Sequence, residues 1–182
     1  MQRVFLVGAR ASGKSTVGRN LAKMLDCPFL DTDIELAADL GCSIDEFVKG
    51  NGWDAFRRKE HEVLARLAGR KDEPENGDWL VIATGGGMVL LPENRKILQE
   101  KGTTFYLEAP TDVLVRRLTA NPMLDSRPSL TGKGVTEEVA EIVKARDPLY
   151  REVSRYSVSA DQPVKDILSK ISQKLQTHRV KS

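Results

Sequence analysis

The chain has 182 residues, of which 40% are apolar and 30% charged, a composition that predicts a single folded domain spanning 1–182. The chain has 28 lysine and arginine residues and 26 aspartate and glutamate residues. This near balance argues against binding to nucleic acid through an excess of positive charge. No apolar run approaches the roughly 20 residues that cross a bilayer, and no signal peptide is evident. We therefore expect a cytoplasmic protein with no membrane partner, whose Cys27 and Cys42 are small buried hydrophobes that stay reduced.

Short apolar runs alternate with segments of helical spacing along the chain. The expected strands lie at residues 3–8, 27–33, 79–84, 103–110 and 156–160. The expected helices lie at residues 13–25, 43–69 with a break at glycines 50–52, 92–100, 111–120, 135–153 and 162–176, and the segments 70–78 and 121–134 are expected to be loops. Since strands that alternate with helices are typical of parallel sheets, we expect an α/β fold in three layers, with a five-stranded parallel sheet flanked by helices.

The segment Gly8–Thr16, GARASGKST, falls between the first expected strand and the first expected helix. It matches the phosphate-loop pattern G-x-x-x-x-G-K-[ST], in which backbone N–H groups face phosphate oxygens. In this pattern Lys14 reaches the β- and γ-phosphates and Ser15 offers its hydroxyl to Mg²⁺. The expected nucleotide-binding residues of the loop are Ala11, Ser12, Gly13, Lys14, Ser15 and Thr16.

Other phosphate-loop proteins carry motifs that this chain lacks. A GTPase would need an N-K-x-D motif, and none is present. A large ATPase motor would need an Asp-Glu pair after a buried strand, whereas the third expected strand runs into Gly85–Gly87. The acidic groups of the site must therefore come from another segment.

Asp31 and Asp33 follow the second expected strand. Residues two apart in an extended chain point to the same side, and ligands bind at the carboxyl ends of parallel strands. We expect Asp31 to orient Mg²⁺ through water and Asp33 to accept the proton of an attacking hydroxyl. The alternative is an aspartate that caps the following helix, 34–40.

Arginines and glycines supply the remaining candidates. Arg57 and Arg58 point about 100° apart on a helix, so only one can face a site, and a solvated helix face is the alternative. Three consecutive glycines, Gly85–Gly87, suggest backbone that approaches a ligand closely. Arg146 has the forked donor geometry that suits a carboxylate. Trp53 lines either the substrate side of its helix or the core.

The motifs GARASGKST, DTD, FRRKE, ATGGG, RPSLTGKG and RDPLYREVS, in this order and spacing, closely resemble the shikimate kinase family over nearly the whole chain. The resemblance implies a P-loop kinase fold, related to nucleoside monophosphate kinases, that uses MgATP to phosphorylate the 3-hydroxyl of shikimate in aromatic amino-acid biosynthesis. It implies a substrate-binding region at about 31–62 and a mobile lid at about 121–134.

The resemblance also assigns residues to roles. Catalytic roles fall to Asp33, Lys14 and Arg127, the last being the lid arginine that also contacts the nucleotide. Shikimate-binding positions are Asp33, Arg57, Gly85, Gly86, Gly87 and Arg146, with Glu60 orienting a substrate-binding arginine. One Mg²⁺ ion is placed at Ser15 and Asp31, and adenine packs against Arg117.

The chain departs from compact members of this family in its long segments. The lid is longer and its SLTGK resembles the enterobacterial type-II branch, while 70–78 is a further insertion whose role is open. Near Gln162, where some members place an arginine over adenine, the adenine contact is also left open.

Two other functions remain as alternatives. One is another small-molecule kinase of the same fold, such as a gluconate kinase, and the other is a nucleotide-dependent switch with no acceptor. His61 and His178 lack metal-ligand spacing and are expected to be structural or solvated. Tyr150, one helical turn after Arg146, is expected to pack beneath it. Nothing demands more than a monomer.

Overall fold

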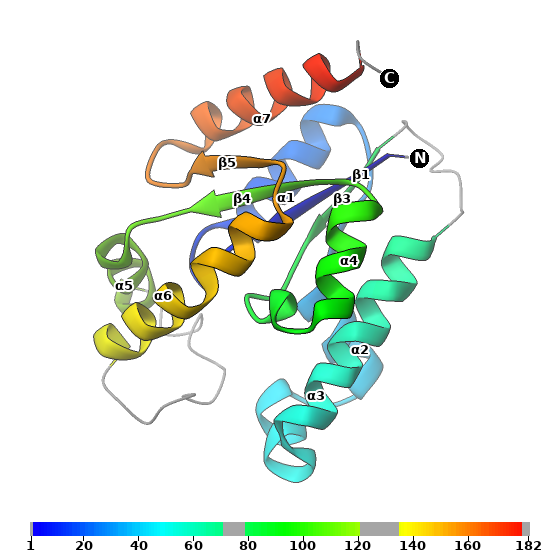
Figure 1. Cartoon of the computed structure of the whole chain (residues 1–182), viewed down its shortest axis with the longest axis vertical. Helices are drawn as coiled ribbons and strands as arrows, with labels where there is room; N and C mark the ends of the chain where they lie inside the picture. The colour runs from blue at the N-terminus through cyan, green and yellow to red at the C-terminus, as the bar shows by residue number, and fades with distance from the viewer. Residues whose placement is uncertain (1, 71–78, 121–134, 180–182) are drawn as a thin grey trace.

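The computed structural model describes residues 2–70, 79–120 and 135–179 (Figure 1). Residues 71–78 of the expected loop 70–78 and the whole expected loop 121–134, with Arg127, lie outside these residues. The side chain of His178 is not described either. The expectation that both cysteines are buried is wrong, because Cys27 is half-buried and Cys42 is exposed.

Five parallel strands form one sheet in the order β2-β3-β1-β4-β5. Their bounds are β1 Gln2–Val7, β2 Phe29–Asp31, β3 Trp79–Ala83, β4 Thr103–Glu108 and β5 Tyr156–Ser159. The central pairings align Val4 with Val81 in β3 and with Thr103 in β4. The sheet confirms the expected fold class, and the second strand is shorter than the expected 27–33.

Helices cover both faces of this sheet, as Figure 1 shows. Helices α1 (Lys14–Leu25) and α7 (Val164–Arg179) lie on one face, and α4 (Pro92–Glu100) and α6 (Val135–Val153) lie on the other. Every residue of Val4–Val7 is 0% exposed. A strand buried on both faces reads as a continuous apolar run, which explains why the sequence signal for β1 is so clear.

The remaining helices are α2 (Thr32–Leu40), α3 (Ile44–Gly69), α5 (Thr111–Ala120) and a 3₁₀ turn, η1 (Met88–Leu90). Helix α3 begins with a capping box, in which Ser43 Oγ accepts from the backbone of Glu46 and the Glu46 carboxylate accepts from the backbone of Ser43. Gly52 interrupts it with φ 79° and ψ 168°, at the glycines where a break is expected. In the described ranges, no helix combines the length and the apolar character needed to cross a membrane.

Replacing Ser43 with alanine is expected to lower the free energy of unfolding by about 1 kcal/mol, because the first turn of α3 loses its capping hydroxyl. The measurement is urea unfolding followed by circular dichroism. Ser169→Ala is the matched control, since Ser169 is an exposed residue inside α7, where alanine is the better helix former. Equal stability of the two variants would contradict a role for this cap.

Candidate active site

The segments that follow the strands carry the candidate residues to the carboxyl edge of the sheet. The phosphate loop follows β1, Asp31 ends β2, and the triple glycine follows β3. In a parallel sheet this edge is where ligands bind. The fold therefore gathers residues that lie far apart in the chain: the contact between Arg146 and Gly86 spans 60 positions and that between Arg117 and Ala11 spans 106.

The phosphate loop joins β1 to the N-terminus of α1. Gly13 caps α1 with φ 94°, a backbone conformation that favours glycine, and Ala11 also has a positive φ, 61°. Lys14 is 9% exposed, and its ammonium donates to Gly8 O at 2.9 Å and to Ala9 O at 2.7 Å. The lysine thus lies folded over the loop, next to the partial positive charge of a helix N-terminus.

Ser15 and Asp31 are brought together at the start of this helix. Ser15 Oγ donates to Asp31 Oδ2 at 2.6 Å, and the other carboxylate oxygen accepts from the backbone N–H of Asp33 at 3.0 Å. Asp31 is 7% exposed and is the N-cap of α2. One carboxylate oxygen of Asp31 therefore caps α2, and the other accepts the hydrogen bond from Ser15.

The expectation that Asp31 and Asp33 share one side of an extended strand is wrong. Strand β2 ends at Asp31 and α2 begins at Thr32, so Asp33 lies in the first turn of a helix. The turn carries Asp33 to the triple glycine instead. A Cβ atom at Gly85 would lie 2.6 Å from Asp33 Oδ1 and 3.1 Å from Glu60 Oε1, so only glycine fits there.

Arg57 is held by its own helix. It forms an ion pair with Glu60, which is 1% exposed, and its guanidinium lies 5.3 Å from the ring centroid of Trp53. A Cβ atom at Gly87 would overlap this guanidinium, so the glycine allows the arginine to lie against the turn. Arg58 is exposed, in agreement with the expectation that only one of the pair faces the site.

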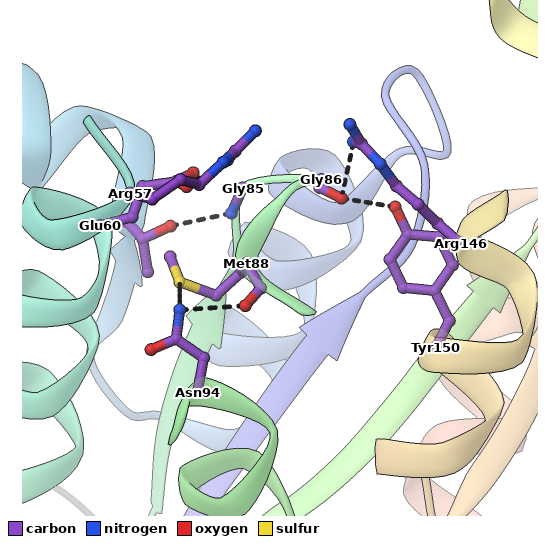
Figure 2. Close-up of polar contacts among 9 residues, drawn as sticks. Arg57, Glu60, Gly85, Gly86, Met88, Asn94, Arg146 and Tyr150 are labelled. Atoms are coloured by element: carbon purple, nitrogen blue, oxygen red, sulfur yellow. Dashed lines mark hydrogen bonds and ion pairs between the residues drawn. The ribbon is translucent and has the colours of Figure 1, made fainter. Parts of the chain in front are cut away.

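Arg146 approaches the same turn from α6. Its Nη1 donates to Gly86 O at 3.1 Å, and Tyr150 Oη donates to the same oxygen at 2.6 Å, so the tyrosine packs beneath the arginine as expected. Figure 2 shows the guanidinium groups of Arg57 and Arg146 reaching from opposite sides toward the space beside the Gly85–Gly86 turn. Two forked cations that converge in this way suit a carboxylate.

These arginines line an open cleft of about 420 Å³ between α3 and α6. A cleft of this size admits a small molecule. Trp53 therefore lines the cleft and also packs on the core through Phe56, whose ring centroid lies 5.6 Å away. The full lining is Trp53, Arg57, Leu90, Glu141, Ile142, Ala145 and Arg146.

Comparison with known proteins gives the family. The family model described as shikimate kinase matches residues 10–176. The chain belongs to the shikimate kinase family. It is 48% identical to the shikimate kinase of Nitratidesulfovibrio vulgaris, over 93% of each chain, and 42% identical to shikimate kinase 2 of Dickeya chrysanthemi, over 93% of this chain and 94% of that one.

A solved structure agrees with these relatives. The shikimate kinase from Acinetobacter baumannii in complex with shikimate superposes with a TM-score of 0.87, at 34% identity, over 98% of this chain and 94% of that one. The chain is therefore an ATP-dependent kinase with the fold of this family.

Arg117, the residue that the shikimate kinase resemblance assigns to adenine, lies in α5 and contacts two distant backbone carbonyls. Its Nη2 donates to Ala160 O at 2.8 Å and its Nη1 donates to Ala11 O at 3.3 Å, so it links the phosphate loop to the segment after β5. Gln162, in that segment, donates to Ser159 O at 2.5 Å and accepts from Lys170 at 2.7 Å. The Gln162 amide thus has partners within its own segment.

Several residues of the site escape sequence reasoning. Thr32 lies between the two aspartates, is 1% exposed, and its Oγ1 accepts from the backbone N–H of Gly85 at 2.9 Å. The position of the Thr32 hydroxyl between two candidate site residues was the sequence signal that could have identified it. Residues 141, 142 and 145 line the cleft because they lie within about one and a half turns of Arg146 on one helix, a pattern that helical spacing could have revealed.

His61 has a structural partner, as expected. Its Nδ1 lies 2.7 Å from Asn94 Oδ1, and Asn94 Nδ2 donates to Met88 O at 3.0 Å (Figure 2 shows the second contact). Since an amide oxygen only accepts, this contact requires the proton on His61 Nδ1. Among the described residues, no cluster of three His, Cys, Asp or Glu side chains could hold a metal ion.

Proposed function

We propose that the chain transfers the γ-phosphoryl group of MgATP to the 3-hydroxyl of shikimate, giving shikimate 3-phosphate and ADP in aromatic amino-acid biosynthesis. The observation that carries this proposal is the convergence of Arg57 and Arg146 on one glycine turn, within a cleft beside Asp33 and the phosphate loop. Family membership and the shikimate-bound relative support the identity of the acceptor.

The phosphate loop supplies the donor half of the site. We propose that the β- and γ-phosphates replace the carbonyl partners of Lys14, with N–H groups of the loop from Ala11 to Thr16 around them. Ser15 and Asp31 fit a magnesium site, because a hydroxyl and a carboxylate lie 2.6 Å apart and Mg²⁺ binds few protein oxygens besides phosphate and water. The ion would neutralise charge on the phosphates.

The acceptor half is built from Arg57, Arg146 and the glycine turn. In the proposed complex the two guanidinium groups grip the shikimate carboxylate, each charge-assisted contact contributing roughly 1.5–3 kcal/mol. Glu60 holds Arg57 from beneath, through the buried ion pair. The turn Gly85–Gly87 lets both arginines and the substrate approach the backbone closely.

Asp33 is the proposed catalytic carboxylate. It lies against Gly85 in the first turn of α2, where it can bind ring hydroxyls and accept or orient the proton of the attacking one. We assign general-base action of roughly 10²–10⁴ in rate to it. Arg117 is proposed to pack on adenine, and Arg127, in the proposed lid 121–134, to stabilise the transferring phosphoryl group.

A coupled assay of ADP release tests the reaction with shikimate, with gluconate and with no acceptor. Shikimate is expected to give rapid, MgATP-dependent ADP release, with far slower release in the other two reactions. Faster turnover of gluconate would favour the related sugar-acid kinase, and equal rates with and without acceptor would favour a nucleotide-dependent switch. We also propose that the enzyme acts as a monomer in the cytoplasm, since nothing in its sequence demands a second copy.

A further inference from the structure

The carbonyl oxygen of Gly86 accepts two hydrogen bonds from side chains of α6 (Figure 2). Tyr150 Oη donates at 2.6 Å, which is shorter than the 3.1 Å bond from Arg146 Nη1. Tyr150 is 1% exposed, so its hydroxyl has little access to solvent. A phenol has one O–H donor, and here that donor is given to a single backbone carbonyl.

Gly86 lies between the two halves of the proposed site. A Cβ atom at this position would lie 3.5 Å from Gly8 O and 3.5 Å from Arg10 N, both in the phosphate loop. The Gly86 carbonyl also accepts from Arg146 Nη1, so the orientation of this peptide affects where the Arg146 guanidinium lies. Glycine backbone has much conformational freedom, so an external anchor is needed to hold this peptide in one orientation.

Tyr150 is itself well anchored. Its ring stacks on the ring of Tyr106, with centroids 5.1 Å apart and an interplanar angle of 28°. The anchor is the ring of Tyr106 and not its hydroxyl, which donates to Asp147 Oδ1 at 2.9 Å. Burial raises the pKa of Tyr150 to about 12, so the hydroxyl keeps its proton, and remains a donor, at neutral pH.

We infer that Tyr150 is a positioning residue for the acceptor: its hydroxyl holds the Gly86 carbonyl, on which Arg146 also rests, and thereby orients Arg146 toward the substrate carboxylate. The inference rests on the proposed function of this cleft. Arg146 must offer its fork to the incoming carboxylate, whereas Tyr150 can hold the turn with or without substrate. The acceptor side of the site is therefore preorganised before shikimate arrives.

The test is Tyr150→Phe, which removes one hydroxyl and keeps the ring that stacks on Tyr106. We expect the KM for shikimate to rise about three- to tenfold, the worth of one hydrogen bond, with the KM for ATP and kcat nearly unchanged. In an Arg146→Lys background, the same change is expected to have a smaller effect on shikimate KM, because both residues act on one carbonyl.

Tyr106→Phe is the matched control. It removes the other hydroxyl of the stacked pair, for which the described contact is with Asp147 and not with Gly86, and its shikimate KM is expected to stay near wild type. A normal shikimate KM in Tyr150→Phe would overturn the inference, as would equal rises in both KM values with a lowered midpoint of urea unfolding. Failure of the wild-type chain to phosphorylate shikimate would instead overturn the proposed function, and the inference with it.

Discussion

Asp33→Asn is expected to lose nearly all phosphoryl transfer to shikimate while it keeps its fold and its affinity for MgATP. The asparagine amide cannot accept a proton from an attacking hydroxyl, and general-base action alone is worth roughly 10²–10⁴ in rate. The same change weakens the grip on ring hydroxyls, since a charged acceptor binds them more strongly than a neutral one. Steady-state kinetics with shikimate measures the loss in kcat.

The fold is expected to survive because asparagine has nearly the same size and shape as aspartate, and because the cap of α2 comes from Asp31. Asp31 caps α2 by accepting from the backbone N–H of Asp33, which the substitution leaves in place. Asp31 also keeps its bond to Ser15, so the proposed magnesium site is preserved. The variant gives up an acidic side chain in the first turn of α2, which costs about 0.3–1 kcal/mol of stability.

Asp39→Asn is the matched control on the same helix. Asp39 pairs with Arg66 of α3 at 2.8 Å, on an exposed face, so its loss is expected to leave both KM values and kcat unchanged. An Asp33→Asn enzyme that turns over shikimate within about tenfold of wild type would show that Asp33 is neither the base nor an essential anchor.

Much of the fold was predictable from local sequence patterns, such as the helical spacing of apolar residues. The helices at 111–120 and 135–153 form over the ranges that helical spacing predicts, and the second of them continues through Pro148. The 3₁₀ turn at 88–90 was not predicted, because three residues are too few to show a period. Strand β2 ends earlier than expected, since its last residue is already the cap of α2.

The candidate site was predictable where the contacting residues lie close together in one sequence motif. The phosphate loop is such a motif, because its lysine, its serine and its glycines lie within nine residues. Contacts between distant elements left no such signal. The bond from Thr32 to Gly85 spans 53 positions, and that from Tyr106 to Asp147 spans 41, so only the packing of the folded chain brings them together.

The second large effect, on the KM for shikimate, is expected at Arg57. Its exposed neighbour Arg58 provides the matched control. Arg57 shares its guanidinium between the buried Glu60 and the cleft, and it lies against Gly87 and the ring of Trp53. A planar fork can satisfy a carboxylate on each side, whereas the ammonium of lysine is a single point charge. Lysine still supplies a cation near Glu60, so the buried carboxylate is not left without a positive neighbour.

Arg57→Lys is therefore expected to raise the KM for shikimate about ten- to hundredfold, corresponding to the roughly 1.5–3 kcal/mol of one charge-assisted contact. The KM for ATP is expected to stay unchanged, because Arg57 belongs to α3 and to the cleft and not to the phosphate loop. Arg58→Lys makes the same chemical change at the neighbouring exposed position and is expected to behave as wild type. If the two variants have equal shikimate KM values, Arg57 does not hold the acceptor carboxylate, and the clamp must be assigned to Arg146 alone.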